Sequence, residues 1–140
     1  SSRPPTFAVA ESTPPTVSDR TDQGIALLFT LSAQNDNDVA LPLRDVEYTV
    51  ELDGWKVFSG TRSAEATLRR LGTQQITLPA VIAGSVPSPA TGRVPYRISG
   101  TVTYVTPGQI AEILFDTGVR VPTASFSGQG EVDLSQQPIP

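Results

Sequence analysis

The chain has 140 residues, a formal net charge of −4, one lysine, and neither cysteine nor histidine. Its length indicates one domain that is large enough to bury a core without disulfides. The missing residue types exclude thiolate nucleophiles, thiolate metal sites and histidine-based acid–base catalysis. The acidic balance argues against a nucleic-acid partner, which requires clustered lysine and arginine. No apolar run reaches the roughly 18 residues that a membrane-spanning helix needs.

Alternating apolar and polar residues predict short strands from the start of the chain. The first is expected over residues 6–11, and a polar connection follows over residues 11–24. A second strand is expected over residues 24–34, with five apolar side chains on one face: Ile25, Leu27, Phe29, Leu31 and Ala33. Its other face carries Ala26, Leu28, Thr30 and Ser32, which predicts a strand that is largely covered on both sides.

A run of four polar residues, Asn35 to Asp38, ends this second strand. Its side-chain oxygens suit a hard cation, but adjacent residues cannot all converge on one ion, and a calcium loop needs spaced ligands. Asn and Asp also close turns by local hydrogen bonds and tolerate a left-handed backbone. We therefore interpret the run as a structural corner, with a calcium site as the alternative.

The middle of the chain holds the clearest alternation, over residues 46–52, followed by Asp53-Gly54. Asp-Gly between alternating runs predicts a two-residue hairpin, because both central residues need a positive φ. The returning strand begins at Trp55. We expect Trp55 to pack in the core, and the alternative is an exposed aromatic anchor beside Lys56 and Phe58. Glu47 and Glu51 fall on the solvent face about 13 Å apart, too far apart for the carboxylate pair of a hydrolase.

Further short strands are expected over residues 66–70 and 74–78, then an irregular proline-rich connection over residues 79–95. The next strand spans residues 96–104, and Gly100 within it indicates a bulge or a close backbone approach. The segment 109–116 is compatible with either a strand or helical turns. Residues 119–127 and 130–134 complete the pattern. About seven strands with regular turns predict an all-β fold, a single antiparallel β-sandwich.

The order of these features resembles the type 2 late-embryogenesis-abundant family, whose module is also called the water-stress-and-hypersensitive-response (WHy) domain. The resemblance covers roughly residues 6–134, and its motifs are an Asn-x-Asn strand end, a Leu-Pro pair, and Tyr-, Gly- and Phe-bearing strands. The matching residues are Asn35, Asp36, Asn37, Leu41, Pro42, Tyr48, Gly54, Gly60, Tyr96, Gly100, Phe126 and Gly130. Asp36 departs from the family's proline. A helix that some members carry after the position of Val81 is not expected in this proline-rich region.

The resemblance implies a sandwich like those of fibronectin type III and immunoglobulin domains, formed by residues 6–134. Residues 1–5 would be an N-terminal tether and residues 135–140 a C-terminal tail. It implies no enzyme activity, catalytic residue, metal or cofactor. It also implies a place in the cell envelope or periplasm, with a lipid anchor upstream of Ser1 as one form, and the cytoplasm as the alternative.

The function expected from the resemblance is protection during desiccation or water stress. A monomeric folded domain would make weak, nonspecific contact with client proteins or a membrane surface. The main alternative is an adhesive or scaffolding sandwich of the cell envelope that binds a protein partner through loops or an edge strand. A calcium-dependent binding domain is the second alternative, and it depends on the Asn35 to Asp38 run alone.

Overall fold

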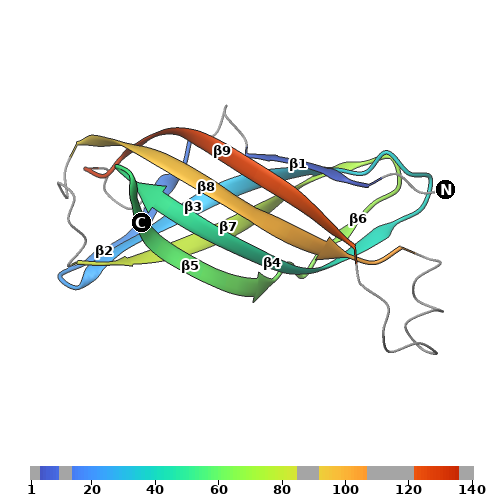
Figure 1. Ribbon diagram of the computed structural model, residues 1–140, viewed down its shortest axis with the longest axis horizontal. Helices are drawn as coiled ribbons and strands as arrows, with labels where there is room; N and C mark the ends of the chain where they lie inside the picture. Colours follow the sequence, from blue (N-terminus) through green and yellow to red (C-terminus); the bar gives the residue numbers. More distant parts are fainter. Residues whose placement is uncertain (1–3, 10–13, 85–91, 107–121, 136–140) are drawn as a thin grey trace.

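The chain folds into two antiparallel sheets that face each other. The computed structural model describes residues 4–9, 14–84, 92–106 and 122–135, and within them it has nine strands and no helix (Figure 1). The strands are β1 (Thr6–Val9), β2 (Thr16–Thr21), β3 (Gly24–Gln34), β4 (Leu41–Leu52), β5 (Trp55–Ser63), β6 (Thr67–Leu68), β7 (Thr73–Ala83), β8 (Arg93–Tyr104) and β9 (Thr123–Asp133). The fold is therefore the all-β sandwich that the alternation predicts.

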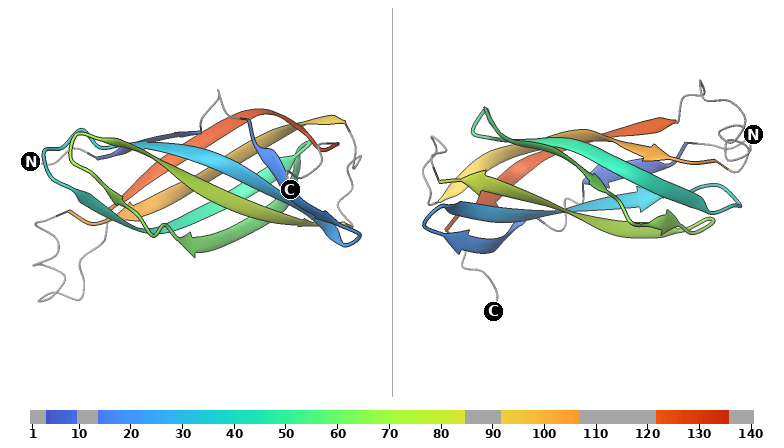
Figure 2. Two further views of the ribbon diagram at one scale, coloured as in Figure 1. Left: turned by 180° about the vertical axis from the view of Figure 1, so that it is seen from behind. Right: turned by 90° about the horizontal axis from the view of Figure 1, so that it is seen from below.

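The first sheet is built around β3. β1 and β2 pair with successive halves of one edge of β3, and β7 pairs along the whole of its other edge. The second sheet has the order β5-β4-β8-β9, with β6 paired to the start of β4. The first sheet thus brings together strands from the N-terminal half and the middle of the chain (Figure 2).

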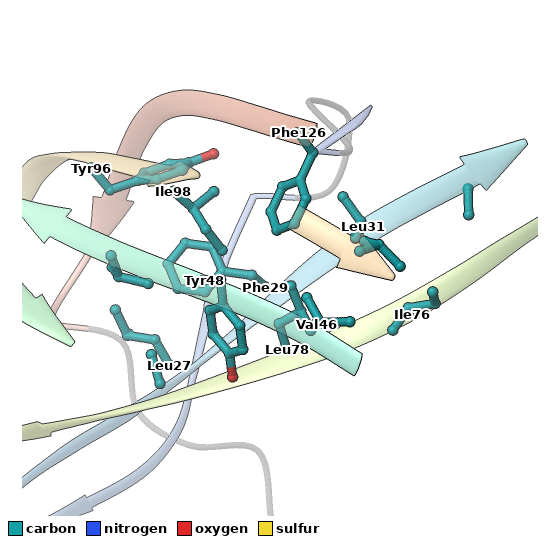
Figure 3. Packing of buried hydrophobic residues seen from close by; sticks show 14 of the residues in the cluster. Leu27, Phe29, Leu31, Val46, Tyr48, Ile76, Leu78, Tyr96, Ile98 and Phe126 are labelled. Carbon is teal, nitrogen blue, oxygen red and sulfur yellow. The ribbon is translucent and has the colours of Figure 1, made fainter. Parts of the chain in front are cut away.

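The core lies between the sheets and is supplied by every second residue of the long strands. In β3 the inward-facing residues from Leu27 to Ala33 are buried, which is what a period of two predicts. Phe29 meets Tyr96 of the second sheet edge to face, with ring centroids 5.5 Å apart (Figure 3). Burying each large apolar side chain contributes about 1.5–3 kcal/mol, so this layer is the main stabilising feature.

The hairpin between β4 and β5 has the predicted two-residue turn. Asp53 and Gly54 have φ values of 51° and 81°, which fit the type I′ turn that Asp-Gly favours. Trp55 follows directly and pairs with Leu52, but its side chain is 59% exposed. The expectation that Trp55 packs in the core is therefore wrong. Trp55 shares a face with its buried partner Leu52, but it is the first residue of an edge strand, so its side chain lies largely outside the core.

Strand β2 lies inside the segment that was expected to be a polar connection. Its sequence, TVSDRT, does not alternate between apolar and polar residues, so it was not recognised as a strand. In the fold the pairing register shifts between Val17 and Asp19, and Val17 is the residue of β2 that is buried. Pairing with β3 across a tight turn decides its conformation. The described residues form nine strands where about seven were expected, and β2 accounts for one of the additional strands.

Strand β7 overturns the irregular connection that was expected over residues 79–95. It continues through Pro79 to Ala83, and β8 already begins at Arg93. Proline is tolerated because β7 is an edge strand, where one side of the backbone needs no partner. β9 likewise runs unbroken through Gly128 and Gln129, where a gap between two strands was expected. β6 is shorter than expected, and the segment 109–116 lies outside the described residues.

The two sides of the sandwich differ. On one side β9 lies beside β1, and the Arg20 guanidinium donates a hydrogen bond to the Leu134 carbonyl across the gap between the sheets. On the opposite side β5 and β7 are both edge strands, and among the described residues each has one paired neighbour, β4 and β3 respectively (Figure 2, right). We call the side where β9 lies beside β1 the closed side of the sandwich, and the side with the edge strands β5 and β7 the open side.

Candidate functional site

The Asn35 to Asp38 run forms a corner that ties two loops together. Asn35 is 1% exposed, and its amide nitrogen donates to the carbonyls of Val39 at 2.9 Å and Arg69 at 3.1 Å. Its amide oxygen accepts from the backbone nitrogen of Asn37 at 3.0 Å and from the Asn37 side chain at 2.9 Å. Backbone bonds from Asn35 to Gly72 and from Leu71 to Asn37 complete the join. The arrangement is that of a structural corner.

The acidic side chains of this corner point away from one another and into separate contacts. Asp36 accepts a hydrogen bond from the Gln34 amide at 2.7 Å, and Asp38 forms an ion pair with Arg70 at 2.7 Å. Within the described residues, no three acidic side chains lie where they could hold a metal ion together. The geometry therefore gives no support to the calcium alternative.

The remaining motif residues form rows across the second sheet. Gly60, Tyr48, Gly100 and Phe126 are register partners on β5, β4, β8 and β9, so glycines and rings alternate along one row. In a second row Tyr96 pairs with Gly130. The rings cover the glycines: a Cβ on Gly100 would lie 2.9 Å from the Phe126 ring and 2.2 Å from the Glu47 carbonyl oxygen. The close approach expected at Gly100 is present, and these motif residues serve packing.

The Leu-Pro pair lies next to the corner and joins it to β8. Leu41 is fully buried and pairs with Leu68, while the Pro42 carbonyl accepts a hydrogen bond from the Val105 nitrogen at 2.9 Å. The structure thus divides the predicted motif into two groups, a loop-end group around Asn35 and a packing group around Tyr48. Gly54 belongs to neither group, because it lies in the hairpin at the far end of β4.

Tyr48 also links the two sheets. Its hydroxyl donates a hydrogen bond to the Pro79 carbonyl of β7. Figure 3 shows the Tyr48 hydroxyl pointing toward the yellow-green ribbon of β7. Burial raises the pKa of the Tyr48 hydroxyl, although the charge of Arg62 and a hydrogen bond from it oppose the shift. Burial likewise raises the pKa of Tyr104. Neither tyrosine is placed to lose a proton near neutral pH, so this pair does not make a catalytic site.

The outer face of the first sheet is the surface that stands out chemically. β3 and β7 each span 11 residues and contain no Asp, Glu, Lys or Arg. Their outward residues form four cross-strand pairs: Ala26 with Val81, Leu28 with Pro79, Thr30 with Thr77, and Ser32 with Gln75. We call these four pairs, together with Ala83, the uncharged face. The second sheet, by contrast, carries charged residues on all four of its long strands.

The uncharged face changes from apolar to polar along its length. Toward the β2–β3 turn it holds a shallow hollow of about 360 Å³, lined by Asp19, Thr21, Gln23, Gly24, Ile25, Ala26, Val81 and Ala83. Val81 is 66% exposed there. The residues on the outer side of β3 predicted that this side would be largely covered, but Figure 2 (left) shows no described strand over it. In the sequence, this surface could have been recognised from the absence of charged residues in two 11-residue strands.

The uncharged face can contact another macromolecule, but its side chains do not supply an acid, a base or a nucleophile for catalysis. Its side chains are aliphatic, hydroxyl and amide groups, none of which titrates near neutral pH. Contact with the four cross-strand pairs displaces water without stripping a charge of its hydration, which keeps the cost of binding low. The carboxylate of Asp19 borders the hollow at one end of the face. In the described part of the chain, no helix is long and apolar enough to cross a membrane.

Comparison with known proteins now identifies the family. Residues 30–123 match the LEA_2 family, described as late embryogenesis abundant protein. The chain belongs to this family. The match begins within β3 and ends at the start of β9, so it includes the corner, β4 to β8 and the second part of β3. LEA_2 proteins are stress proteins and not enzymes, which gives this chain a stress-related role in general terms. No curated protein has a significant sequence match to it.

Solved structures share the LEA_2 fold at low sequence identity. The solution structure of a putative late embryogenesis abundant protein, At2g46140.1, is 19% identical with a TM-score of 0.70, covering 96% of this chain and 72% of that one. The solution structure of the Arabidopsis thaliana protein AT1g01470 is 15% identical with a TM-score of 0.66, covering 86% and 78%. A crystal structure of an Archaeoglobus fulgidus protein is 13% identical with a TM-score of 0.56, covering 95% and 97%. At these identities the likeness extends to the fold alone.

Proposed function

We propose that this LEA_2 protein protects other macromolecules during desiccation or water stress by direct, non-catalytic contact with client proteins or membrane surfaces. The observation that carries the proposal is the uncharged face on β3 and β7, opposite a charged second sheet. A client would lie against the uncharged face. The charged second sheet would stay in contact with the water that is left, and repulsion between its charges would keep the complexes apart.

The physical basis is the asymmetry between the two sheets. Uncharged side chains lose little on desolvation, so they can touch a varied partner surface weakly without specific pairing. The net charge of −4 keeps protein molecules soluble and separated as their concentration rises. Weak and exchangeable contact fits a protein that must release its clients when water returns.

Two finer statements also belong to this proposal. On the motif order, we place the chain in the type 2, or WHy, group of the family. We also place it in the cell envelope, held by a lipid anchor attached upstream of Ser1. A lipobox cysteine in the coding sequence directly before Ser1 would support that location, and a coding sequence without any export signal would argue for the cytoplasm.

The experiment compares two double variants that carry the same added charge on different sheets. Val81→Lys with Ala83→Lys places two lysines on the uncharged face, and Ser125→Lys with Ser127→Lys places two on exposed positions of β9. Each protein is dried with lactate dehydrogenase and, separately, with dye-filled phosphatidylcholine vesicles, and then rehydrated. Recovered enzyme activity and retained dye are measured against an equal mass of an unrelated acidic β-sandwich.

We expect the native protein and the β9 variant to protect equally, and the Val81/Ala83 variant to protect much less. Protection of enzyme alone would identify proteins as the clients, and protection of vesicles alone would identify membranes. Equal protection by both variants would remove the uncharged face from the mechanism. Equal protection by the unrelated sandwich would reduce the effect to crowding and would contradict the proposed function.

An adhesive or scaffolding module remains the second candidate, because the unpaired edge of β7 is the kind of surface that partner strands use. A binding measurement in dilute solution distinguishes the two functions. A scaffold binds one partner saturably and at a fixed stoichiometry without drying, whereas a protective protein makes weak contact with many partners.

A further inference from the structure

The open side of the sandwich exposes the backbone of β7. Within the part of the chain that the structure describes, β7 pairs with β3 alone, and its other edge faces a groove of about 230 Å³ toward the end of β5 and the segment that follows it. The groove is lined by Arg62, Ser63, Ala64, Glu65 and Ala66 on one side and by Gln74, Gln75, Ile76, Thr77 and Leu78 on the other. An unpaired edge of this kind is a template for another strand.

The hydrogen bonds at the ends of β7 show which backbone groups face outward. The Gly72 carbonyl accepts from the Asn35 nitrogen, and the Gly84 nitrogen donates to the Gln23 carbonyl, so both residues face β3 and its turns. The N–H and C=O of one strand residue point to the same side, and that side alternates along the strand. The odd-numbered residues, among them Thr73, Gln75 and Thr77, therefore direct both groups to the open edge.

Pro79 divides this edge into two parts. It has no N–H, and the Tyr48 hydroxyl occupies its carbonyl, so no strand can pair at this position. The facing edge of β5 is also unsuited to pairing. It carries a register shift at Val57 and the charged residue Lys56, and Arg62 lies opposite the buried Val46 at the margin of the core. Shifts, lysines and inward charges are the usual protections of an edge.

The five residues from Thr73 to Thr77 carry none of these protections. Their sequence, Thr-Gln-Gln-Ile-Thr, has no charge, no proline and no glycine. The outward residues of this segment, Thr73, Gln75 and Thr77, match themselves when the strand is turned end to end about Gln75, whereas Gln74 would face Ile76. Thr73 would face Thr77 of another copy, and each Gln75 would face the other, so every outward N–H meets an outward C=O. Threonine pairs across strands are favourable, and no like charges oppose each other.

We propose that a second copy of this chain pairs with β7 over Thr73–Thr77, antiparallel and about a two-fold axis at Gln75. Each of the three facing pairs exchanges both of its backbone hydrogen bonds. The inward side chains of the added strand, Gln74 and Ile76, enter the groove beside their counterparts. The first sheets of the two copies join into one, and the two uncharged faces become continuous. Such an isologous contact closes as a dimer and does not propagate.

The dimer forms at high concentration. Five paired residues bury less surface than the roughly 1,600 Å² of a stable interface, so the complex dissociates in dilute solution. Loss of water raises the protein concentration and shifts the equilibrium toward the dimer by mass action. This inference stands independently of the proposed client contact, because the pairing needs only the edge and its sequence.

The first test uses two proline variants that remove outward N–H groups from the same edge. Gln75→Pro lies within the pairing segment, and Val81→Pro lies beyond Pro79 as the matched control. Both leave the pairing with β3 intact, which circular dichroism and melting curves verify. Analytical ultracentrifugation from micromolar to millimolar concentration should show a weak dimer for the native chain and for Val81→Pro. Gln75→Pro should lower the association constant about tenfold or more, because two hydrogen bonds are lost.

A native chain that stays monomeric over this range would overturn the proposal, as would a Gln75→Pro variant that dimerises like the native protein. The second test does not depend on the proline variants. The chain has no cysteine, so Gln75→Cys supplies a single thiol on the proposed axis, where paired Cα atoms lie about 5.5 Å apart and a disulfide can form. Mild oxidation should cross-link Gln75→Cys at several times the yield of Val81→Cys. Equal yields would contradict the two-fold register.

Discussion

At the scale of single residues, the polar groups of this protein mostly hold loops in place. Asn35 is the clearest case, because one amide group bonds to carbonyls in two loops and to its neighbour Asn37. Buried polar groups must find such partners, since each one left without a partner costs about 1–3 kcal/mol. The same rule explains why Tyr48 can bury its ring, because the Pro79 carbonyl accepts a hydrogen bond from its hydroxyl group.

Replacing Asn35 tests the corner. Asn35→Ala removes the bonds to Val39 and Arg69 and leaves their carbonyls without the amide donor. We expect the free energy of unfolding, measured in urea, to fall by about 2–3 kcal/mol. Asp36→Ala, at the exposed neighbouring position, should change it by less than about 0.5 kcal/mol. A loss of similar size in both variants would contradict the assignment of Asn35 as the corner's centre.

The buried tyrosines predict a dependence of stability on alkaline pH. Burial raises the pKa values of Tyr48 and Tyr104 above their usual value of about 10. The unfolded chain therefore loses these protons first, so their contribution to stability is complete below pH 10 and is lost as the pH rises through the folded-state pKa. Tyr48→Phe should cost about 1 kcal/mol at pH 7 and make the decline above pH 10 shallower. An unchanged alkaline decline in urea unfolding would rule out Tyr48 as a source.

At the scale of the strands, the second sheet is organised by glycines that lie beside aromatic rings. Gly60 and Gly100 flank Tyr48 in register on either side, and the rings of Phe58 and Phe126 lie over them. Glycine weakens a strand because it has no side chain to pack. Here a neighbouring ring fills that space, so aromatic residue and glycine act as one packing unit.

Gly100→Ala tests this unit. An added Cβ would lie 2.2 Å from the Glu47 carbonyl oxygen and 2.9 Å from the Tyr48 Cα, both backbone atoms that cannot move alone. We expect the free energy of unfolding to fall by about 1–3 kcal/mol or more, as for overpacked cores. Thr101→Ala, one position along β8, is the control and should have a much smaller effect. Equal melting temperatures for Gly100→Ala and the native protein would contradict the close approach.

Over the whole molecule, the two sheets differ in charge: all four long strands of the second sheet carry charged residues, whereas β3 and β7 of the first sheet carry none. Its central contacts are distant in sequence, since β3 pairs with β7 and β4 with β8. Stability therefore depends on the core as a whole. Phe29 is 1% exposed and contacts Tyr96 from the opposite sheet, so it joins the two halves.

Replacing Phe29 is expected to lower both the stability of the protein and its protective activity. Phe29→Ala should lower the free energy of unfolding by about 3–5 kcal/mol, and adding Leu78→Ala at its register partner should leave the chain unfolded. In the drying assay we expect protection to fall in the order native protein, unrelated acidic sandwich, unfolded double variant. Exposed apolar segments favour aggregation. If the unfolded variant protects best, a flexible chain is the active form.

Local patterns were sufficient for much of this fold. The alternation of β3 and β4, the Asp-Gly turn and the close approach at Gly100 were readable because each depends on a period of two or on one backbone requirement. The order of the motifs also pointed to the LEA family. The placement of Trp55 was not readable, because a residue after a hairpin turn can face either way until the edge of the sheet is known.

Composition and strand periodicity are properties of short segments, so they were enough to predict an all-β sandwich without cysteine or histidine chemistry. Three features depend on a partner elsewhere in the chain and became visible in the folded protein: β2 is a strand, β7 continues through Pro79, and Asn35 is buried. The candidate site shows the same division. The missing charges of β3 and β7 are visible in the sequence, but their union into one face follows from pairing between segments about 50 residues apart.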